Sequence, residues 1–141
     1  YNISLEGKHV VIIGRSIIVG IPLYLLLLHE NATITICHSK TLDIKKHTLL
    51  ADIIIIGIGK PKFLKNDMIK NGCCAIIDVG INNILDVTNK NRHKLVGDID
   101  YDNIINSGKV SYISPVPGGV GPMTIAMLMK NTINSAIKQC I

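Results

Sequence analysis

Apolar runs alternate along the chain with short polar segments that are rich in glycine and proline. The run "ADIIIIGIG" (51–59) is uninterrupted, which is typical of a parallel strand that is covered on both faces. Four further runs have the length and composition of strands: "HVVIIG" (9–14), "ATITICHS" (32–39), "CCAIIDVGI" (73–81) and "VSYIS" (110–114). The pattern therefore predicts a series of buried strands.

The segments between these strands are either helical in their apolar spacing or polar and irregular. Helices are predicted over 19–31, over 41–50 with Thr41 as the N-cap, over 101–108, and from Met123 to about Lys138. The segment 82–98 is polar and predicts a small hairpin at most. Since strands alternate with helices, we expect βαβ units and the α/β class, with a doubly wound, mostly parallel, Rossmann-like sheet.

Composition limits the partners of this fold. The chain has 141 residues, of which 48% are hydrophobic and 18% charged, and this balance indicates a single core-forming domain. Its net charge of +5 comes from scattered lysines, and one Phe without any Trp argues against nucleic-acid binding. The longest apolar runs are too short to span a bilayer, and the cysteines form no C-x-x-C pair. We therefore expect no membrane, no metal and a reducing compartment, the cytoplasm or an organelle.

The polar and glycine-rich segments fall where the predicted strands end. The carboxyl ends of parallel strands meet at one edge of a sheet, and ligands of such folds bind there. We predict that this edge carries Gly14, Ser39, Gly59, Ile81 and Pro117.

The first of these segments, "GRSIIVG" (14–20), connects the first strand to the first helix. Gly14 and Gly20 permit a tight turn whose N–H groups approach a pyrophosphate, and Ser16 can add a hydroxyl donor. The second glycine of the G-x-G-x-x-G motif is missing. A plain turn between strand and helix is therefore an equally good interpretation.

The end of the second strand, "TITICHSKT" (33–41), bears on the choice of cofactor. NAD sites place Asp or Glu here to bind the ribose 2′-hydroxyl, whereas this strand ends in Ser39 and Lys40. Arg15 leaves the first turn close by and offers an always-charged guanidinium. Arg15 and Ser39 therefore indicate a pocket for the 2′-phosphate of NADP, although composition alone favours a surface arginine and a turn serine.

A rigid loop with few side chains, "PVPGGVGPMT" (115–124), follows the last strand. Its prolines stiffen the chain and its glycines let the backbone approach a flat ligand, so we interpret the loop as a substrate wall. His38, Cys73–Cys74 and the pair Asp78 and Asp98 are weaker candidates. We expect a structural role for the histidine, apolar packing for the cysteines, and no acid/base dyad of the aspartates.

Six segments, in this order, resemble one enzyme family: "GRSIIVGIP", "ATITICHSKT", "IGKP", "IDVGIN", "GDID" and "SPVPGGVGPMTIAMLMKNT". The family is the bifunctional methylenetetrahydrofolate dehydrogenases/methenyltetrahydrofolate cyclohydrolases, and the resemblance covers essentially the whole chain. It implies oxidation of 5,10-methylenetetrahydrofolate with NADP, followed by hydrolysis of the methenyl product to 10-formyltetrahydrofolate. It also implies a homodimer in one-carbon metabolism, which serves purine and amino-acid biosynthesis.

The resemblance implies roles for individual residues as well. Gly14, Arg15 and Ser16 would contact the cofactor, with Ser39 at its 2′-phosphate and Ile81 against the nicotinamide end. The folate side of the cleft would be lined by Pro117, Gly118, Gly119, Val120 and Gly121. The sequence departs from the family pattern at Ile17 and Ile21, which replace an asparagine and a lysine. Loss of that lysine is expected to weaken phosphate binding.

By this resemblance, residues 1–141 are the second, NADP-binding domain of a two-domain enzyme, and 1–7 are the end of the interdomain linker. The catalytic lysine would lie in the N-terminal domain, so no catalytic residue is expected here. The helix 123–138 is apolar around much of its circumference and would pack on that domain. Alone, the chain is expected to self-associate and to be inactive.

Two other interpretations remain at this point. One is a non-catalytic NADP-binding module from a truncated paralogue. The other is a generic NADP-dependent reductase, which requires a Tyr-x-x-x-Lys motif on a helix. The segment "YDNII" (101–105) lacks that lysine, so the reductase is disfavoured.

Overall fold

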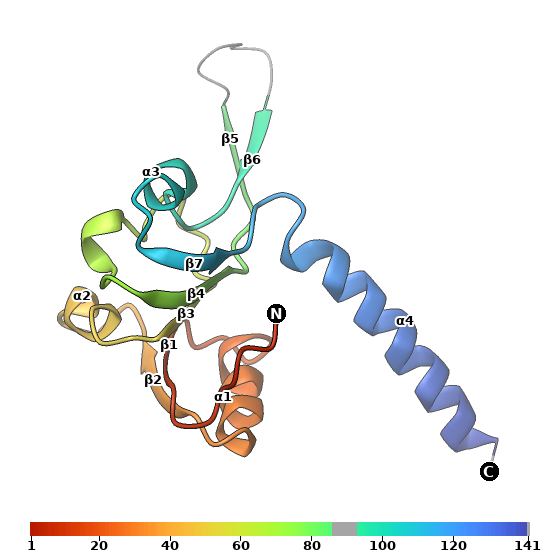
Figure 1. Ribbon diagram of the computed structural model, residues 1–141. Coiled ribbons are helices and arrows are strands. Elements are labelled where there is room, and N and C mark those ends of the chain that lie inside the picture. Colours follow the sequence, from red (N-terminus) through yellow and green to blue (C-terminus); the bar gives the residue numbers. More distant parts are fainter. Residues whose placement is uncertain (86–92, 141) are drawn as a thin grey trace.

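Five parallel strands form the main sheet of the domain (Figure 1). The structure is a computed structural model that describes residues 1–85 and 93–140. Across the sheet, the strands are β2 (Thr33–Cys37), β1 (His9–Ile13), β3 (Ile53–Ile56), β4 (Cys73–Asp78) and β7 (Val110–Ile113). All neighbouring pairs in this sheet are parallel, so the predicted α/β class with a mostly parallel sheet is confirmed.

Helices and a hairpin connect these strands. The helices are α1 (Gly20–His29), α2 (Ile44–Thr48), the 3₁₀ helix η1 (Asn66–Met68), α3 (Tyr101–Ile105) and α4 (Val120–Gln139). The antiparallel hairpin of β5 (Asn82–Leu85) and β6 (His93–Val96) confirms the hairpin predicted in 82–98. Residues 86–92 of that segment lie outside the described residues.

The two faces of the sheet pack against different helices, as a doubly wound sheet requires. The isoleucines of β3 are all buried, with 54 and 56 in one core cluster and 53 and 55 in the other. The first cluster packs against α2, η1 and α3, and the second packs against α1. The uninterrupted apolar run therefore marks the strand that is covered on both faces.

The start of α2 differs from the prediction. Asp43 caps the helix, because its carboxylate accepts a hydrogen bond from the N–H of Lys46 at 3.1 Å. Thr41, the predicted cap, instead accepts from the N–H of His38 and stabilises the turn that follows β2. The predicted cap was therefore wrong, and the helix is shorter than expected.

The helix α4 extends away from the rest of the domain (Figure 1). It begins at Val120 rather than at the predicted Met123, because Pro122 fits the first turn of a helix, where an N–H donor is not needed. None of its residues, all of which the structure describes, is buried, and its exposed apolar side chains include Met127 and Ile133. The apolar surface of α4 is therefore open to another element or another chain.

One face of the sheet is incompletely covered next to the start of α4. A groove of about 540 Å³ lies there, lined in part by Tyr1, Ile77, Tyr112 and Met123. Tyr1 rests against Tyr112, with ring centroids 4.9 Å apart. The groove lies on the face that α1 covers elsewhere, since Ile77 packs against the same cluster as α1.

At the amino end of the strands, side chains brace the sheet. Asp52 accepts from the N–H of His9 at 2.9 Å and from the Lys70 ammonium at 2.6 Å. The His9 ring lies 2.9 Å from the Thr35 hydroxyl. The hydrogen bond from Lys70, helped by the N–H of His9, holds the pKa of Asp52 below its usual range. This edge is therefore a partly exposed polar brace between β1, β2, β3 and β4.

Candidate functional site

The loops that follow the five parallel strands meet at one edge of the sheet. Gly14 follows β1, Ser39 follows β2 and Gly59 follows β3. Ile81 and Pro117 follow β4 and β7. The structure therefore places all five residues that we predicted for the carboxyl edge at that edge.

Close packing explains the glycines of the first turn. Gly14 has a φ of +128°, and a Cβ built on it would lie 2.7 Å from the carbonyl oxygen of Gly57. A Cβ on Gly20 would collide with the carbonyl oxygen of Gly14. Both positions exclude a side chain, so a ligand can approach the backbone of the turn closely. The N–H groups of Gly20 and Ile21 at the start of α1 are bonded to Ser16.

Ser16 ties this turn to the helix. Its hydroxyl oxygen accepts from the N–H of Val19 at 3.1 Å and from that of Gly20 at 3.4 Å. Because the lone pairs of the oxygen are directed to the helix, the hydroxyl proton is available to a bound acceptor. Ser16 therefore retains a hydroxyl proton that it could donate to a ligand, and its predicted contact with the cofactor stays a prediction.

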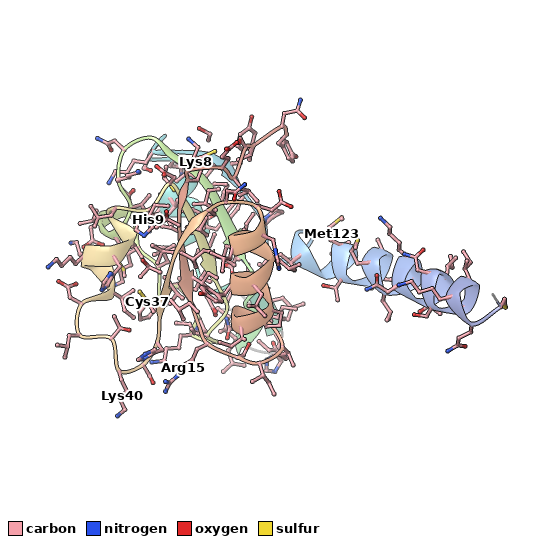
Figure 2. The ribbon with its side chains drawn as sticks, turned by 90° about the horizontal axis from the view of Figure 1, so that it is seen from below. Lys8, His9, Arg15, Cys37, Lys40 and Met123 are labelled. Carbon is pink, nitrogen blue, oxygen red and sulfur yellow. The ribbon has the colours of Figure 1, made fainter. Side chains whose placement is uncertain are left out.

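A cleft of about 300 Å³, called here the first cleft, opens beside the turn. Its polar lining comes from the loops after β1, β2 and β3: Gly14, Arg15, Ser16, His38, Ser39 and Lys60. Arg15 and Ser39 thus share one cleft, as we expected from the missing carboxylate. Figure 2 shows Arg15 and Lys40 at this end of the sheet and Lys8 at the opposite end. Lys60 was missed, although the segment "IGKP" at the end of a strand was a signal for it.

The lining of the first cleft suits a nucleotide with anionic groups. Ile44, Ile58 and Phe63 supply an apolar part that a base can contact. Arg15 and Lys60 supply positive charge, and the described lining contains no Asp or Glu. The uncovered turn, the hydroxyls and the cations therefore fit the phosphates of a dinucleotide such as NADP.

His38 serves the loop itself. The imidazole Nδ1 of His38 accepts from the backbone N–H of Lys40 at 3.1 Å, and the backbone N–H of His38 donates to the Thr41 hydroxyl at 2.9 Å. These bonds hold Ser39 between two fixed neighbours. The histidine therefore has the structural role that we expected.

A second cleft, of about 390 Å³, lies between the end of β4 and the loop that precedes α4. Ile81, which is 66% exposed, lines one side, and every residue of 115–122 lines the other. A Cβ on Gly119 would collide with the carbonyl oxygen of Pro115, so this loop is a tight turn. The residues expected on the folate side, 117–121, thus share a cleft with the residue expected beside the nicotinamide.

Two buried carboxylates hold the loops between these clefts. Asp78 is 1% exposed and accepts from the N–H groups of Gly80, Asp98 and Ile99 at 2.9, 3.1 and 3.0 Å. Burial raises the pKa of Asp78, the three N–H groups oppose the rise, and the Asp98 carboxylate adds to it. We expected no acid/base dyad and overlooked that the aspartates are neighbours. The nearby glycines, Gly80 and Gly97, were the available signal, since a Cβ at either would collide with one of the carboxylates.

The cysteines are placed for packing. Cys37 and Cys73 are buried, and burial raises the pKa of both thiols, that of Cys73 to about 11.

Within residues 1–85 and 93–140, no three His, Cys, Asp or Glu side chains gather so that they could hold a metal ion. Among the helices in the described part of the chain, none combines the length and the apolar character needed to cross a membrane.

The fold and the two clefts define a dinucleotide-binding α/β domain, with its ligand site at the carboxyl edge of a parallel sheet. Residues 1–140 match the sequence profile described as tetrahydrofolate dehydrogenase/cyclohydrolase, NAD(P)-binding domain. The chain belongs to this family. The resemblance inferred from the six sequence segments is thereby confirmed.

Curated relatives contain this domain within longer chains. The chain is 58% identical over 136 residues to the bifunctional protein FolD of Campylobacter hominis, covering 96% of this chain and 45% of that protein. It is 56% identical over 138 residues to the bifunctional protein FolD of Caldicellulosiruptor saccharolyticus, covering 98% of this chain and 47% of that protein. The chain therefore spans about half the length of these relatives.

Solved structures agree with the fold. The bifunctional methylenetetrahydrofolate dehydrogenase/cyclohydrolase FolD from Campylobacter jejuni superposes with a TM-score of 0.86 at 48% identity, over 96% of this chain and 45% of that one. The Trypanosoma brucei methylenetetrahydrofolate dehydrogenase-cyclohydrolase superposes with a TM-score of 0.83 at 41% identity, over 93% of this chain and 44% of that one. That enzyme was solved in complex with NADP cofactor and an inhibitor.

Proposed function

We propose that this chain is the NADP-binding domain of an enzyme that oxidises 5,10-methylenetetrahydrofolate and hydrolyses the methenyl product to 10-formyltetrahydrofolate. The first cleft is the observation that carries the proposal. Arg15 and Ser39 both line it, and Ser39 follows β2, where an NAD site has a carboxylate. The relatives support it, since they are bifunctional FolD proteins and the Trypanosoma brucei structure contains NADP.

In this proposal the turn 14–20 binds the diphosphate of the cofactor. The Ser16 hydroxyl donates to it at the positive end of the α1 dipole, and Gly14 keeps the approach clear of side chains. Arg15 forms charge-assisted hydrogen bonds with the 2′-phosphate, and the Ser39 hydroxyl donates to the same group. The cation and the hydroxyl together favour NADP over NAD.

The second cleft receives the nicotinamide and the folate. When bound, NADP supplies the acceptor for the hydride that leaves the folate. Ile81 packs against the nicotinamide end, and the folate side is lined by Pro117, Gly118, Gly119, Val120 and Gly121. Because this lining is rigid and mostly apolar, it orients two flat rings face to face.

The hydrolytic step needs a group that transfers a proton. In the described lining of the second cleft, Asp78 is the titratable side chain, and three backbone N–H groups already occupy it. We therefore place the catalytic lysine on an N-terminal domain of the same enzyme. The groove beside Tyr112 and the open surface of α4 suit contact with that domain.

The assembly and setting follow from the same proposal. We place the enzyme in the cytoplasm as a homodimer, where it supplies one-carbon units for purine and amino-acid biosynthesis. The open apolar surface of α4 supports association, since an exposed stripe of this kind is stabilised by a partner.

Turnover tests this function. The chain alone and the chain joined to the N-terminal domain of the Campylobacter hominis protein are assayed with 5,10-methylenetetrahydrofolate and NADP. We expect the joined protein to form NADPH and then 10-formyltetrahydrofolate, and the chain alone to bind NADP without turnover. Turnover by the chain alone contradicts our placement of the catalytic group. Binding without turnover by the joined protein favours the non-catalytic module instead.

A further inference from the structure

We propose that Asp98 is a positioning residue that, through Asn82, fixes the two clefts of the site relative to each other. This rests on the proposed function, in which the first cleft takes the adenosine half of NADP and the second takes the nicotinamide half. Asp98 is 0% exposed, so it acts through the loops that it holds and touches no ligand.

Asp98 holds the loop of the first cleft by its backbone. Its Oδ2 accepts from the N–H of Ile58 at 2.6 Å and from the N–H of Gly59 at 2.9 Å. Ile58 and the neighbouring Lys60 both line the first cleft. The position of this cleft's wall is therefore set by one carboxylate oxygen.

The other oxygen of the same carboxylate holds the loop of the second cleft. Asp98 Oδ1 accepts from the side-chain amide of Asn82 at 2.8 Å. Asn82 directly follows Ile81, which lines the second cleft. A Cβ on Gly80 would collide with the Asp98 carboxylate, so this loop is also packed directly against it. One side chain thus connects both walls.

Asp98 is itself held in place by Asp78. Its N–H donates to Asp78 Oδ1 at 3.1 Å, and the next N–H, that of Ile99, donates to Asp78 Oδ2 at 3.0 Å. A Cβ on Gly97 would collide with the Asp78 carboxylate. The segment 97–99 therefore has little freedom to shift, and a fixed Asp98 can fix the loops bound to it.

A dinucleotide is sensitive to this arrangement because its two halves bind in different clefts. When the spacing of the clefts is fixed, binding of one half holds the other half near its site, so the second half binds with a smaller loss of entropy. A ligand that fills the first cleft only has no such requirement. Loss of the hydrogen bond between Asp98 and Asn82 should therefore weaken binding of the dinucleotide and leave binding of a ligand that fills only the first cleft unchanged.

The experiment compares Asn82→Ala with Asn83→Ala in the full chain. Asn83 is the next residue on β5 and is exposed, so the control makes the same change without touching Asp98. Each variant is titrated calorimetrically with NADP and with 2′,5′-ADP, which carries the 2′-phosphate but no nicotinamide. We expect Asn82→Ala to weaken NADP binding about tenfold, the value of one hydrogen bond to a charged group, and to leave 2′,5′-ADP binding unchanged. Asn83→Ala should change neither.

Each other outcome has a defined meaning. Equal weakening of both ligands by Asn82→Ala, or no weakening of either, overturns the positioning role and leaves the proposed function standing. A wild-type chain that binds neither ligand contradicts the proposed function itself. Thermal unfolding of every variant is recorded. If Asn82→Ala is unfolded, the same titrations are made with Asn82→Ser, whose hydroxyl is too short to reach Asp98 in the same way, and their result decides whether Asp98 positions the clefts.

Discussion

The two edges of the sheet use aspartate in opposite ways. At the carboxyl edge, Asp78 and Asp98 are buried and accept hydrogen bonds from the loops after β3, β4 and β6. At the amino edge, Asp52 is partly exposed and accepts from Lys70 and from the N–H of His9. A carboxylate is costly to bury unless its oxygens are satisfied, and the N–H groups of buried loops need acceptors.

This difference separates two kinds of polar interaction in one small domain. The carboxyl edge is organised by buried acceptors that hold loops in one geometry, and changes there should affect both folding and binding. The amino edge is braced by an ion pair in contact with water, and changes there should affect stability alone and by less. The predictions below test that contrast.

The largest effect is expected from Gly97→Ala at the carboxyl edge. The added Cβ would collide with the Asp78 carboxylate, so the loop must shift and lose hydrogen bonds to a buried charge. We expect a loss of about 3 kcal/mol or more in the free energy of unfolding, measured by urea denaturation. Gly121→Ala is the control, because among the described residues nothing lies within 4 Å of its added Cβ. Equal stability of the two variants would show that the loop is not tightly held.

Arg15→Ala should have a smaller effect, and on binding only. Arg15 is exposed, so its loss should leave the free energy of unfolding unchanged. NADP binding should weaken by about 1.5–3 kcal/mol, the value of a charge-assisted contact, while NAD binding should hardly change. Titration with both cofactors measures this, with the exposed Lys65→Ala as the control for net charge. Similar losses for NADP and NAD would exclude a role at the 2′-phosphate.

Asp52→Asn at the amino edge should have the smallest effect, and it should depend on pH. The Lys70 hydrogen bond lowers the pKa of Asp52 in the folded state below its unfolded value of 3.8. Stability from this group is therefore present above pH 3.8 and is lost as the pH falls through the folded pKa. We expect the variant to lose about 1 kcal/mol at pH 7, and the difference from wild type to shrink below pH 3.8.

Thermal unfolding of both proteins across this pH range is the measurement. The contribution of Asp78 to the free energy of unfolding should have the opposite pH dependence. Burial raises the pKa of Asp78, so this contribution falls as the pH rises. A wild-type advantage that stays constant down to pH 2 would contradict the role assigned to the Asp52 carboxylate.

Sequence patterns predicted the parts of this molecule that depend on local composition. The isoleucine run of β3 showed a strand covered on both faces, and the order of strands and helices placed Gly14 and Ser39 at the same edge. The end of the second strand without a carboxylate pointed to the first cleft. Each of these signals is visible in local composition or in the order of the segments along the chain, so no tertiary contact was needed to find it.

The features that sequence analysis missed depend on long-range contacts. Thr41 and Asp43 are both good N-caps by type, and the choice is made by Ile44, which packs on the core and sets where α2 begins. Asp98 reaches Ile58 across 40 positions in the sequence, and composition gives no reason to pair them. Contacts of this kind appear only when the loops are placed in space.

The order of the strands has a consequence for synthesis on the ribosome. β1 and β2 emerge first, and β3, β4 and β7 then add to one side of the sheet in chain order, each beside a strand that has already been made. Asp98 emerges only after β6, and until then the N–H groups of Ile58 and Gly59 lack their acceptor. A nascent chain can therefore form most of its sheet before its site is ordered. Tight cofactor binding would report that translation has passed both Asp98 and the loop 115–122 of the second cleft.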